Sequence, residues 1–180
     1  MVKTRFSRRI VIDASVAGSA GGREDAPPHS RYCRDFLLAI RQICHRVFMT
    51  RSVLGEWKRN ESAFSRTWLV SMVAKRKRVL EDDSPREDLR AAVSSETGNQ
   101  SAAAAMLKDM HLREAALKAD GIVASVDKKA RRLFGGAAVG LGELRKISWI
   151  DPTKSPEEVI AWLAKGADPE GYRVLGPTVA

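Results

Sequence analysis

RIVIDAS, residues 9–15, is the stretch of sequence that decides the fold. Its uninterrupted run of Ile10, Val11 and Ile12 is typical of a strand buried on both faces of a parallel sheet. GIVASVD, residues 121–127, repeats the pattern, and both stretches end their apolar run close to an aspartate. Shorter runs at residues 47–49 and 147–150 predict two further strands.

Between these strands lie segments in which apolar residues recur at helical spacing, at residues 36–44 and 105–117. Strands that alternate with helices predict an α/β protein with a central parallel sheet and helices on both faces, a three-layer α/β/α fold. Residues 18–29 and 94–101 are rich in Gly, Pro or polar side chains, so we expect them to be poorly ordered loops.

The pattern Ser-Pro-x-Glu occurs twice, starting at Ser84 and at Ser155. Each copy offers a serine N-cap, a proline at the first helical position and a glutamate for a capping box, so each predicts a helix start. We expect the apolar stripe of the second helix to pack within the chain. We divide the chain into a main domain, residues 1–151, and a C-terminal helix and tail, residues 152–180, of which Gly166 to Ala180 is expected to be loosely held.

The composition favours a polyanionic partner. Lys and Arg number 31 against 22 Asp and Glu, which gives a net charge of +9 and a pI of about 9.9. Such an excess attracts nucleic acid, although a charged surface tuned for solubility has the same composition. Basic runs at Lys75 to Arg78 and at Lys128 to Arg132 are candidate contacts with a nucleic-acid backbone.

Targeting and covalent signals are weak in this sequence. Cys33 and Cys44 fit neither a disulfide framework nor paired zinc ligands. No apolar run reaches the length of a signal-peptide core or a membrane span, so we expect a cytoplasmic protein with no membrane partner.

Two acids stand where a parallel sheet places its ligands. Asp13 and Asp127 directly follow the apolar runs, and ligands bind beyond the carboxyl ends of parallel strands. If the two strands are neighbours, the carboxylates emerge at the same edge of the sheet. The alternative for each is a helix N-cap, a position that Asp favours.

Two further acids lie on predicted helices near that edge. Glu56 lies within two turns of the strand that ends near Met49, and Asp109 lies beside apolar residues in the helix leading to the second stretch. Each has the alternative of an ordinary solvated acid. Four converging carboxylates would repel one another unless a hard cation lay between them, and oxygen-only ligation suits Mg²⁺ or Mn²⁺.

The order of these motifs resembles the PIN-domain family, the nuclease fold of VapC-like toxin ribonucleases. The segments that carry the resemblance are Ile-Val-Ile-Asp13-Ala-Ser15, Val-Leu-Gly-Glu56-Trp, Lys-Asp109-Met-His-Leu-Arg-Glu-Ala-Ala and Ala-Ser125-Val-Asp127 with the Lys-Lys-Ala-Arg that follows. The resemblance covers residues 8 to 150. Asp120 competes with Asp109 as the helical acid, but it precedes the strand and is interpreted as a turn residue.

The resemblance implies a metal-dependent endoribonuclease in which Mg²⁺ or Mn²⁺, held by Asp13, Asp109 and Asp127 with Glu56 close by, activates water and leaves a 5′-phosphate. It also implies orienting hydroxyls, which Ser15 and Ser125 would supply. RNA is the implied substrate, and an antitoxin protein or a second copy in a homodimer is the implied protein partner. The residues expected to hold the RNA backbone are Lys128, Lys129, Arg131 and Arg132.

A different class of function remains open, that of a catalytically inactive PIN-fold module that binds RNA or other proteins, because a fold does not guarantee activity. Nucleotide-cofactor sites fit poorly, because the glycines at 18, 21 and 22 match no phosphate-binding loop. His29, His45 and His111 show no metal-ligand spacing.

Overall fold

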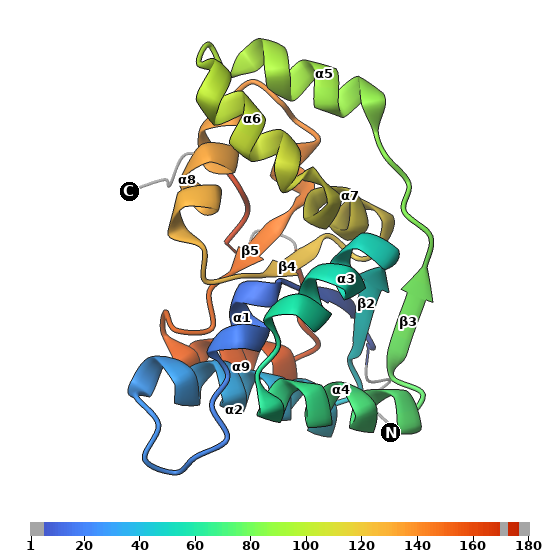
Figure 1. The fold of residues 1–180 in the computed structure, drawn as a ribbon, viewed down its shortest axis with the longest axis vertical. Coiled ribbons are helices and arrows are strands. Elements are labelled where there is room, and N and C mark those ends of the chain that lie inside the picture. The colour runs from blue at the N-terminus through green and yellow to red at the C-terminus, as the bar shows by residue number, and fades with distance from the viewer. Residues whose placement is uncertain (1–5, 170–172, 177–180) are drawn as a thin grey trace.

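β1, Arg9–Ile12, is the central strand, and its Ile10, Val11 and Ile12 are fully buried. The computed structural model describes residues 6–169 and 173–176. Within these residues one parallel sheet forms in the order β3-β2-β1-β4-β5 (Figure 1). Val11 is paired with Phe48 of β2 and with Val123 of β4. The other strands are β2 (Arg46–Thr50), β3 (Arg78–Glu81), β4 (Ile122–Ala124) and β5 (Ser148–Ile150).

Helices cover both faces of this sheet (Figure 1). One face carries α2 (Pro28–Gln42), α4 (Ala63–Ala74) and α9 (Pro156–Ala164). The other carries α7 (Met110–Lys118), with α5 (Glu87–Glu96), α6 (Gln100–Lys108) and α8 (Lys128–Ala137) beside it. α1 (Ala14–Ser19) and α3 (Arg51–Asn60) follow β1 and β2 directly and pack together. The predicted three-layer α/β/α fold is therefore confirmed. Among the described residues no helix is long and apolar enough to cross a bilayer.

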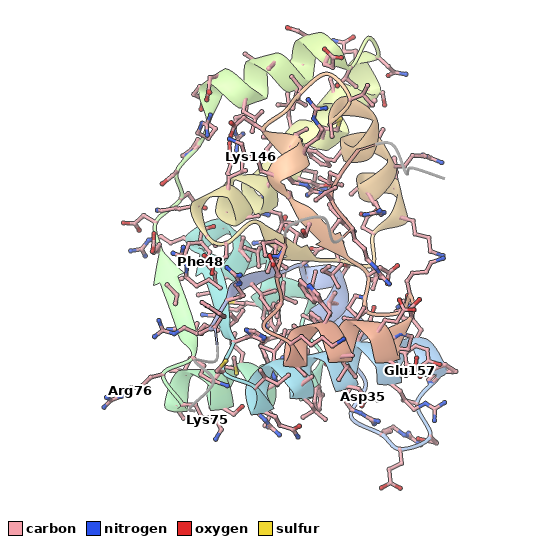
Figure 2. The ribbon with its side chains drawn as sticks, turned by 180° about the vertical axis from the view of Figure 1, so that it is seen from behind. Asp35, Phe48, Lys75, Arg76, Lys146 and Glu157 are labelled. Atoms are coloured by element: carbon pink, nitrogen blue, oxygen red, sulfur yellow. The ribbon has the colours of Figure 1, made fainter. Side chains whose placement is uncertain are left out.

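The core is built by the strands and by the apolar faces of the helices. Figure 2 shows Phe48 inside the molecule, where it is fully buried, and Lys75, Arg76 and Glu157 at the periphery. Trp57 and Trp68, from α3 and α4, stack with ring centroids 5.8 Å apart. Such a pair contributes both buried area and a favourable ring geometry.

The four predicted strands are present, but β3 was not predicted. Its sequence, Arg-Val-Leu-Glu, has two apolar residues between charged ones, and Leu80 is 41% exposed. A half-exposed strand at the margin of a sheet needs no continuous apolar run. The periodicity of residues 78–81 therefore carried no signal for it.

The predicted loops and helix starts are partly wrong. The helix expected to start at Ser84 begins at Glu87, where the N–H of Arg86 donates to the Glu114 carboxylate at 2.8 Å. The predicted loop at 94–101 is helical except for residues 97–99. The predicted loop at 18–29 is irregular between α1 and α2, at residues 20–27. α9 does start after Ser155, but that serine has φ 49° and makes no capping hydrogen bond.

α9 and the segment after it are bound to the rest of the chain. The apolar stripe of α9 packs against α2, with Val159, Trp162 and Leu163 buried. Val174 forms an antiparallel bridge with Ser148 of β5, and Leu175 is 1% exposed. The expectation of a loosely held tail is therefore wrong for residues 173–176, while residues 170–172 and 177–180 lie outside the described residues.

A buried histidine joins α9 to the sheet. The ring of His45 is fully buried; its Nδ1 accepts the N–H of Arg8 at 3.1 Å, and its Nε2 lies 2.8 Å from the carbonyl oxygen of Leu163. A carbonyl only accepts, so we assign the ring proton to Nε2 and the neutral state to the ring. Burial lowers the pKa of His45.

We predict that Val159→Ala lowers the free energy of unfolding by about 2 kcal/mol, because two buried methyl groups are lost and a cavity remains. Val159 is 1% exposed. The matched control is Val70→Ala on α4, where the side chain is 65% exposed and the change should be close to neutral. Urea unfolding measures both. If both substitutions changed the free energy of unfolding equally, the apolar side chains of α9 would not stabilise the core.

We predict that stability falls as the pH drops below 6.5, the ordinary pKa of histidine, because the unfolded chain then binds a proton that buried His45 resists. The folded-state pKa is depressed, so stability present above 6.5 is lost as the pH falls toward that folded value. Urea unfolding at pH 7.5 and 5.5 should show a smaller pH dependence in His45→Gln than in the wild type. His29→Gln, at an exposed histidine, should retain the wild-type dependence.

Candidate functional site

All four predicted acids line one pocket of about 440 Å³. Asp13 follows β1 and Asp127 follows β4, and these strands are hydrogen-bonded neighbours. Glu56 comes from α3, which begins directly after β2 because Thr50 caps it, and Asp109 lies at the junction of α6 and α7. The pocket therefore opens at the carboxyl ends of the central strands. Other polar residues that line it are Ser15, Ser19, Asn60, Lys108 and Arg113.

Two hydroxyl groups fix the orientation of the Asp13 carboxylate, which is 9% exposed. Oδ2 accepts the hydroxyl hydrogens of Ser15 at 2.6 Å and Ser125 at 2.7 Å. The same hydroxyls accept backbone N–H groups, of Val126 at 3.3 Å and Asp127 at 3.1 Å, which join the β1 and β4 ends. No described residue donates to Oδ1 of Asp13. That oxygen remains able to bind a ligand.

Asp127 combines a structural role with its place in the pocket. Its Oδ1 accepts the N–H of Ala130 at 2.8 Å, so it caps α8 as the N-cap interpretation predicts. Asp13 stands at the N-cap position of α1 but makes no capping hydrogen bond. Helix capping therefore accounts for the position of one carboxylate oxygen of Asp127, and it does not account for the Asp13 side chain.

Glu56 is held by a histidine from the opposite helix. Its Oε2 lies 2.9 Å from Nε2 of His111, and His111 belongs to α7. His111 was not expected to take part in a site, because no ligand spacing surrounds it in sequence. The contact joins α3 to α7 across the pocket and leaves Oε1 of Glu56 without a donor among the described residues.

Asp109 is the acid of the four whose charged form is destabilised by its surroundings. Burial raises the pKa of its carboxyl, and the charges of Asp13, Glu56 and Asp127 raise it further, while Arg113 opposes them. No described residue donates a hydrogen bond to either carboxylate oxygen of Asp109. The charged form is therefore disfavoured here unless another cation enters the pocket.

A fully buried arginine lies beside the acids. The Arg113 guanidinium is 3.7 Å from the ring centroid of Phe134 and 4.5 Å from that of Trp149, and Nη1 donates to the Asp109 carbonyl at 3.0 Å. Its Nε and Nη2 have no hydrogen-bond partner among the described residues. Burial lowers the pKa of Arg113 to about 10, so it stays charged at neutral pH. Its spacing of four residues from Asp109 was the only sequence signal for it.

The oxygen atoms of this pocket suit a hard divalent cation. Each of the four carboxylates keeps at least one oxygen free of hydrogen bonds from the described residues. Carboxylate oxygens are the ligands that Mg²⁺ and Mn²⁺ prefer. Within the part of the chain that the structure describes, no three acidic, histidine or cysteine side chains are yet close enough to enclose an ion.

Comparison with known proteins adds nothing to this site. Neither the models of known protein families nor the curated proteins match the chain.

The basic residues predicted to hold RNA divide into three groups. Lys128, Arg131 and Arg132 line a second pocket on α8, whereas Lys129 is exposed and lies outside it. The run from Lys75 lies at the amino end of β3, at the opposite edge of the sheet from the acids. There the Lys77 ammonium donates to carbonyls at the end of α2, including that of Arg41 at 2.8 Å. That lysine therefore has a structural role.

Asp120 lies at the amino end of the sheet, as the turn interpretation requires. Its carboxylate accepts the backbone N–H of Arg9 at 2.6 Å and the guanidinium of the same residue at 3.0 Å. Arg9 is the first residue of β1, whereas Asp13 follows the last. Asp120 is therefore separated from the acid pocket by the length of the strand.

We predict that Asp109→Asn raises the melting temperature of the protein in EDTA at pH 7, because it removes a partly buried charge that the neighbouring acids repel. The pKa of Asp109 is raised in the folded state. The loss of folding stability that its charge causes is therefore absent below the ordinary pKa of 3.8 and grows as the pH rises above it. The gain should shrink as the pH is lowered toward 3.8. Asp25→Asn, at an exposed acid, is the control. A lower melting temperature for Asp109→Asn would contradict this description of the charges.

Proposed function

We propose that this protein is a Mg²⁺- or Mn²⁺-dependent endoribonuclease. The observation that carries the proposal is the convergence of Asp13, Glu56, Asp109 and Asp127 on one pocket, each with an oxygen that no described residue satisfies. Such a cluster is unfavourable as a purely structural feature, since like charges repel one another. The net charge of +9 supports a polyanionic substrate.

The chain's own residues divide the work of hydrolysis among them. Asp13, Asp109 and Asp127 would hold the cation, with Glu56 beside them, and Ser15 and Ser125 would keep Asp13 in position. When bound, the cation supplies Lewis acidity toward a phosphodiester and a water nucleophile. Water oxygen bonds to phosphorus, the bond from phosphorus to the 3′ oxygen breaks, and a proton goes to that oxygen. The products are a 5′-phosphate and a 3′-hydroxyl.

Lys108 is the additional residue that best suits contact with the substrate. It is exposed, it lines the acid pocket and it is adjacent to Asp109 in the chain. An ammonium there can neutralise a phosphate oxygen of the strand being cut. Arg113 is too deeply buried for that role and acts on the carboxylates instead.

The resemblance of four ordered motifs to the PIN-domain family supports the same activity. On that basis we propose a cytoplasmic ribonuclease that acts as the toxin of a toxin–antitoxin pair, with RNA as substrate and with an antitoxin or a second copy as protein partner. The alternative is a PIN-fold module that binds RNA or proteins without turnover. The two differ in one measurable property, metal-dependent cleavage.

We predict that Asp13→Asn lowers the rate of RNA cleavage at least about 100-fold. Mutating a residue that only hydrogen-bonds to a metal ligand lowers activity by up to about 100-fold, and loss of a ligand itself should cost at least as much. Asparagine keeps the shape and can still accept from Ser15 and Ser125. Binding of RNA in EDTA should stay within about twofold of the wild type, since the basic side chains are unchanged.

Cleavage of a mixed pool of RNAs in Mn²⁺ or Mg²⁺, followed by gel electrophoresis, measures the effect, and 5′-end labelling identifies the product. Asp25→Asn is the matched control and should cleave like the wild type. Wild-type protein that binds RNA but cleaves none of it in either metal would favour the inactive module.

A further inference from the structure

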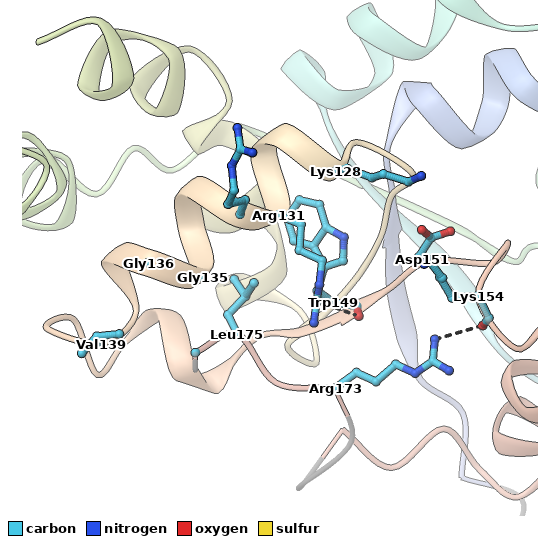
Figure 3. Close-up of a pocket in the computed structure, with 12 residues that line it drawn as sticks. Lys128, Arg131, Gly135, Gly136, Val139, Trp149, Asp151, Lys154, Arg173 and Leu175 are labelled. Atoms are coloured by element: carbon cyan, nitrogen blue, oxygen red, sulfur yellow. Dashed lines mark hydrogen bonds between the residues drawn. The ribbon is translucent and has the colours of Figure 1, made fainter. Parts of the chain in front are cut away.

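A second, larger pocket of about 670 Å³ lies beside α8 (Figure 3), and the residues of α8 that line it differ from those that line the acid pocket. Its size is within the range of pockets that hold small ligands. Five basic side chains line it, and Asp151 is the one acidic side chain among the described lining residues. The basic residues are Lys128, Arg131, Arg132, Lys154 and Arg173.

These cations come from three separate parts of the chain. Lys128, Arg131 and Arg132 share one face of α8, because residues three and four apart are neighbours on a helix. Lys154 follows β5, and Arg173 comes from the segment bound beside that strand. Figure 3 shows Lys128, Lys154 and Arg173 around the pocket, with the guanidinium of Arg173 directed at the carbonyl of Lys154, 3.1 Å away.

The positive charge of this pocket is only partly neutralised from within. Asp151 uses Oδ1 to accept the N–H and hydroxyl of Thr153, at 2.9 and 2.7 Å. Arg173 reaches Glu158 at 3.6 Å. Burial lowers the pKa of Arg131, and the nearby charge of Arg173 lowers it further. Arg173 is thus paired, whereas Lys128, Arg131, Arg132 and Lys154 form no ion pair with an acid among the described residues, and these four cations suit the pocket to an anion.

Two glycines of α8 give an independent sign of a ligand. Gly135 and Gly136 lie within the helix and both line the pocket, yet glycine destabilises a helix relative to alanine. Neither has a positive φ. Among the described residues, a Cβ at Gly135 would approach nothing closer than 3.9 Å, and one at Gly136 would meet nothing within 4 Å. Neither backbone geometry nor packing against the described residues requires these glycines, whereas a ligand that closely approached the helix backbone would.

The two pockets flank the first turn of α8. Asp127 and Ala130 line the acid pocket, while Lys128 and Arg131 line the basic one. A strand with its reacting phosphate at the acids would therefore cross this turn and bring a neighbouring nucleotide to the basic pocket. Val139, which is 59% exposed, and Leu175 add an apolar wall that phosphate alone would not use.

We propose that the basic pocket binds a nucleotide of the RNA strand next to the one being cut, with Arg132 and Lys154 on phosphate and the Gly135–Gly136 face of α8 against the sugar or base. This rests on the proposed ribonuclease function for its substrate. It assigns a part in substrate binding to Lys154, which the sequence did not single out, while Arg173 donates to the Lys154 carbonyl and lines the same pocket. It also separates Lys128, Arg131 and Arg132 from Lys129.

Binding of a fluorescent single-stranded RNA in EDTA, measured by anisotropy from 0.05 to 0.3 M salt, tests the charges. Arg132→Gln and Lys154→Gln should each bind about fivefold more weakly at 0.1 M salt, because one lost contact changes the slope of log affinity against log salt by about 0.7. Lys129→Gln is the matched control on the same helix and should bind within about twofold of the wild type. Equal losses in all three variants, or none, would overturn the assignment.

Gly136→Leu tests the ligand-facing surface of α8. Leucine favours a helix more than glycine does, so the melting temperature should not fall, while RNA affinity should drop as in the charge variants. Gly98→Leu is the control, because a Cβ at that loop glycine also meets nothing within 4 Å. Unchanged affinity in a stable Gly136→Leu protein would sink the proposal.

Free ligands and cleavage complete the test. Saturable binding of adenosine or guanosine monophosphate that Gly136→Leu abolishes, with RNA binding unaffected, would make this a free-nucleotide site and overturn the strand assignment. Variants that lose RNA affinity while the wild type cleaves nothing would support the pocket and reject the nuclease. If the wild type cleaves RNA but the variants bind RNA as the wild type does, the nuclease is supported and the basic pocket is rejected.

Discussion

The mutual repulsion of carboxylates at one edge of the sheet is the constraint on which the rest of the site depends. Parallel pairing of β1 with β4 brings Asp13 and Asp127 to the same edge, and α3 and the α6–α7 junction add Glu56 and Asp109. Arg113 offsets part of that charge from beneath, and it remains protonated although burial lowers its pKa. Two of its nitrogens have no hydrogen-bond partner in the described part of the chain, an arrangement that costs about 1–3 kcal/mol for each unsatisfied group. Phe134 and Trp149 compensate through their ring faces.

The fold and the acids could be predicted from sequence because both depend on local patterns. A buried parallel strand needs an unbroken apolar run, and RIVIDAS and GIVASVD each have one, with the acid at the end where the chain leaves the sheet. β3 could not be predicted in this way, since a half-exposed strand needs only Val79 and Leu80 as its apolar residues. Its first residue, Arg78, is also the last of the basic run that starts at Lys75, and that run was interpreted as a nucleic-acid contact.

The features that sequence reasoning missed depend on partners far away in the chain. The helix start at Ser84 failed because Glu114, 28 residues from Arg86, accepts the N–H that a local cap would have taken. Arg113 looks like an ordinary helix residue until Phe134 and Trp149 are brought to it. The basic pocket joins Lys128 to Arg173, which no spacing rule connects. Only the tertiary structure supplies such pairs.

The bridge between Ser148 and Val174 also makes the two margins of the sheet unequal. The backbone N–H of Trp149 donates to the carbonyl of Arg173 at 2.9 Å, and the backbone N–H of Leu175 donates to the carbonyl of Ile147 at 2.8 Å. The outer side of β5 is therefore already paired. No described strand pairs with the outer side of β3. Unpaired margins are templates on which other chains can add a strand and aggregate, and charged residues discourage this. Aggregation of the folded protein by strand addition would therefore begin at β3, where Arg78 and Glu81 are the residues that oppose it.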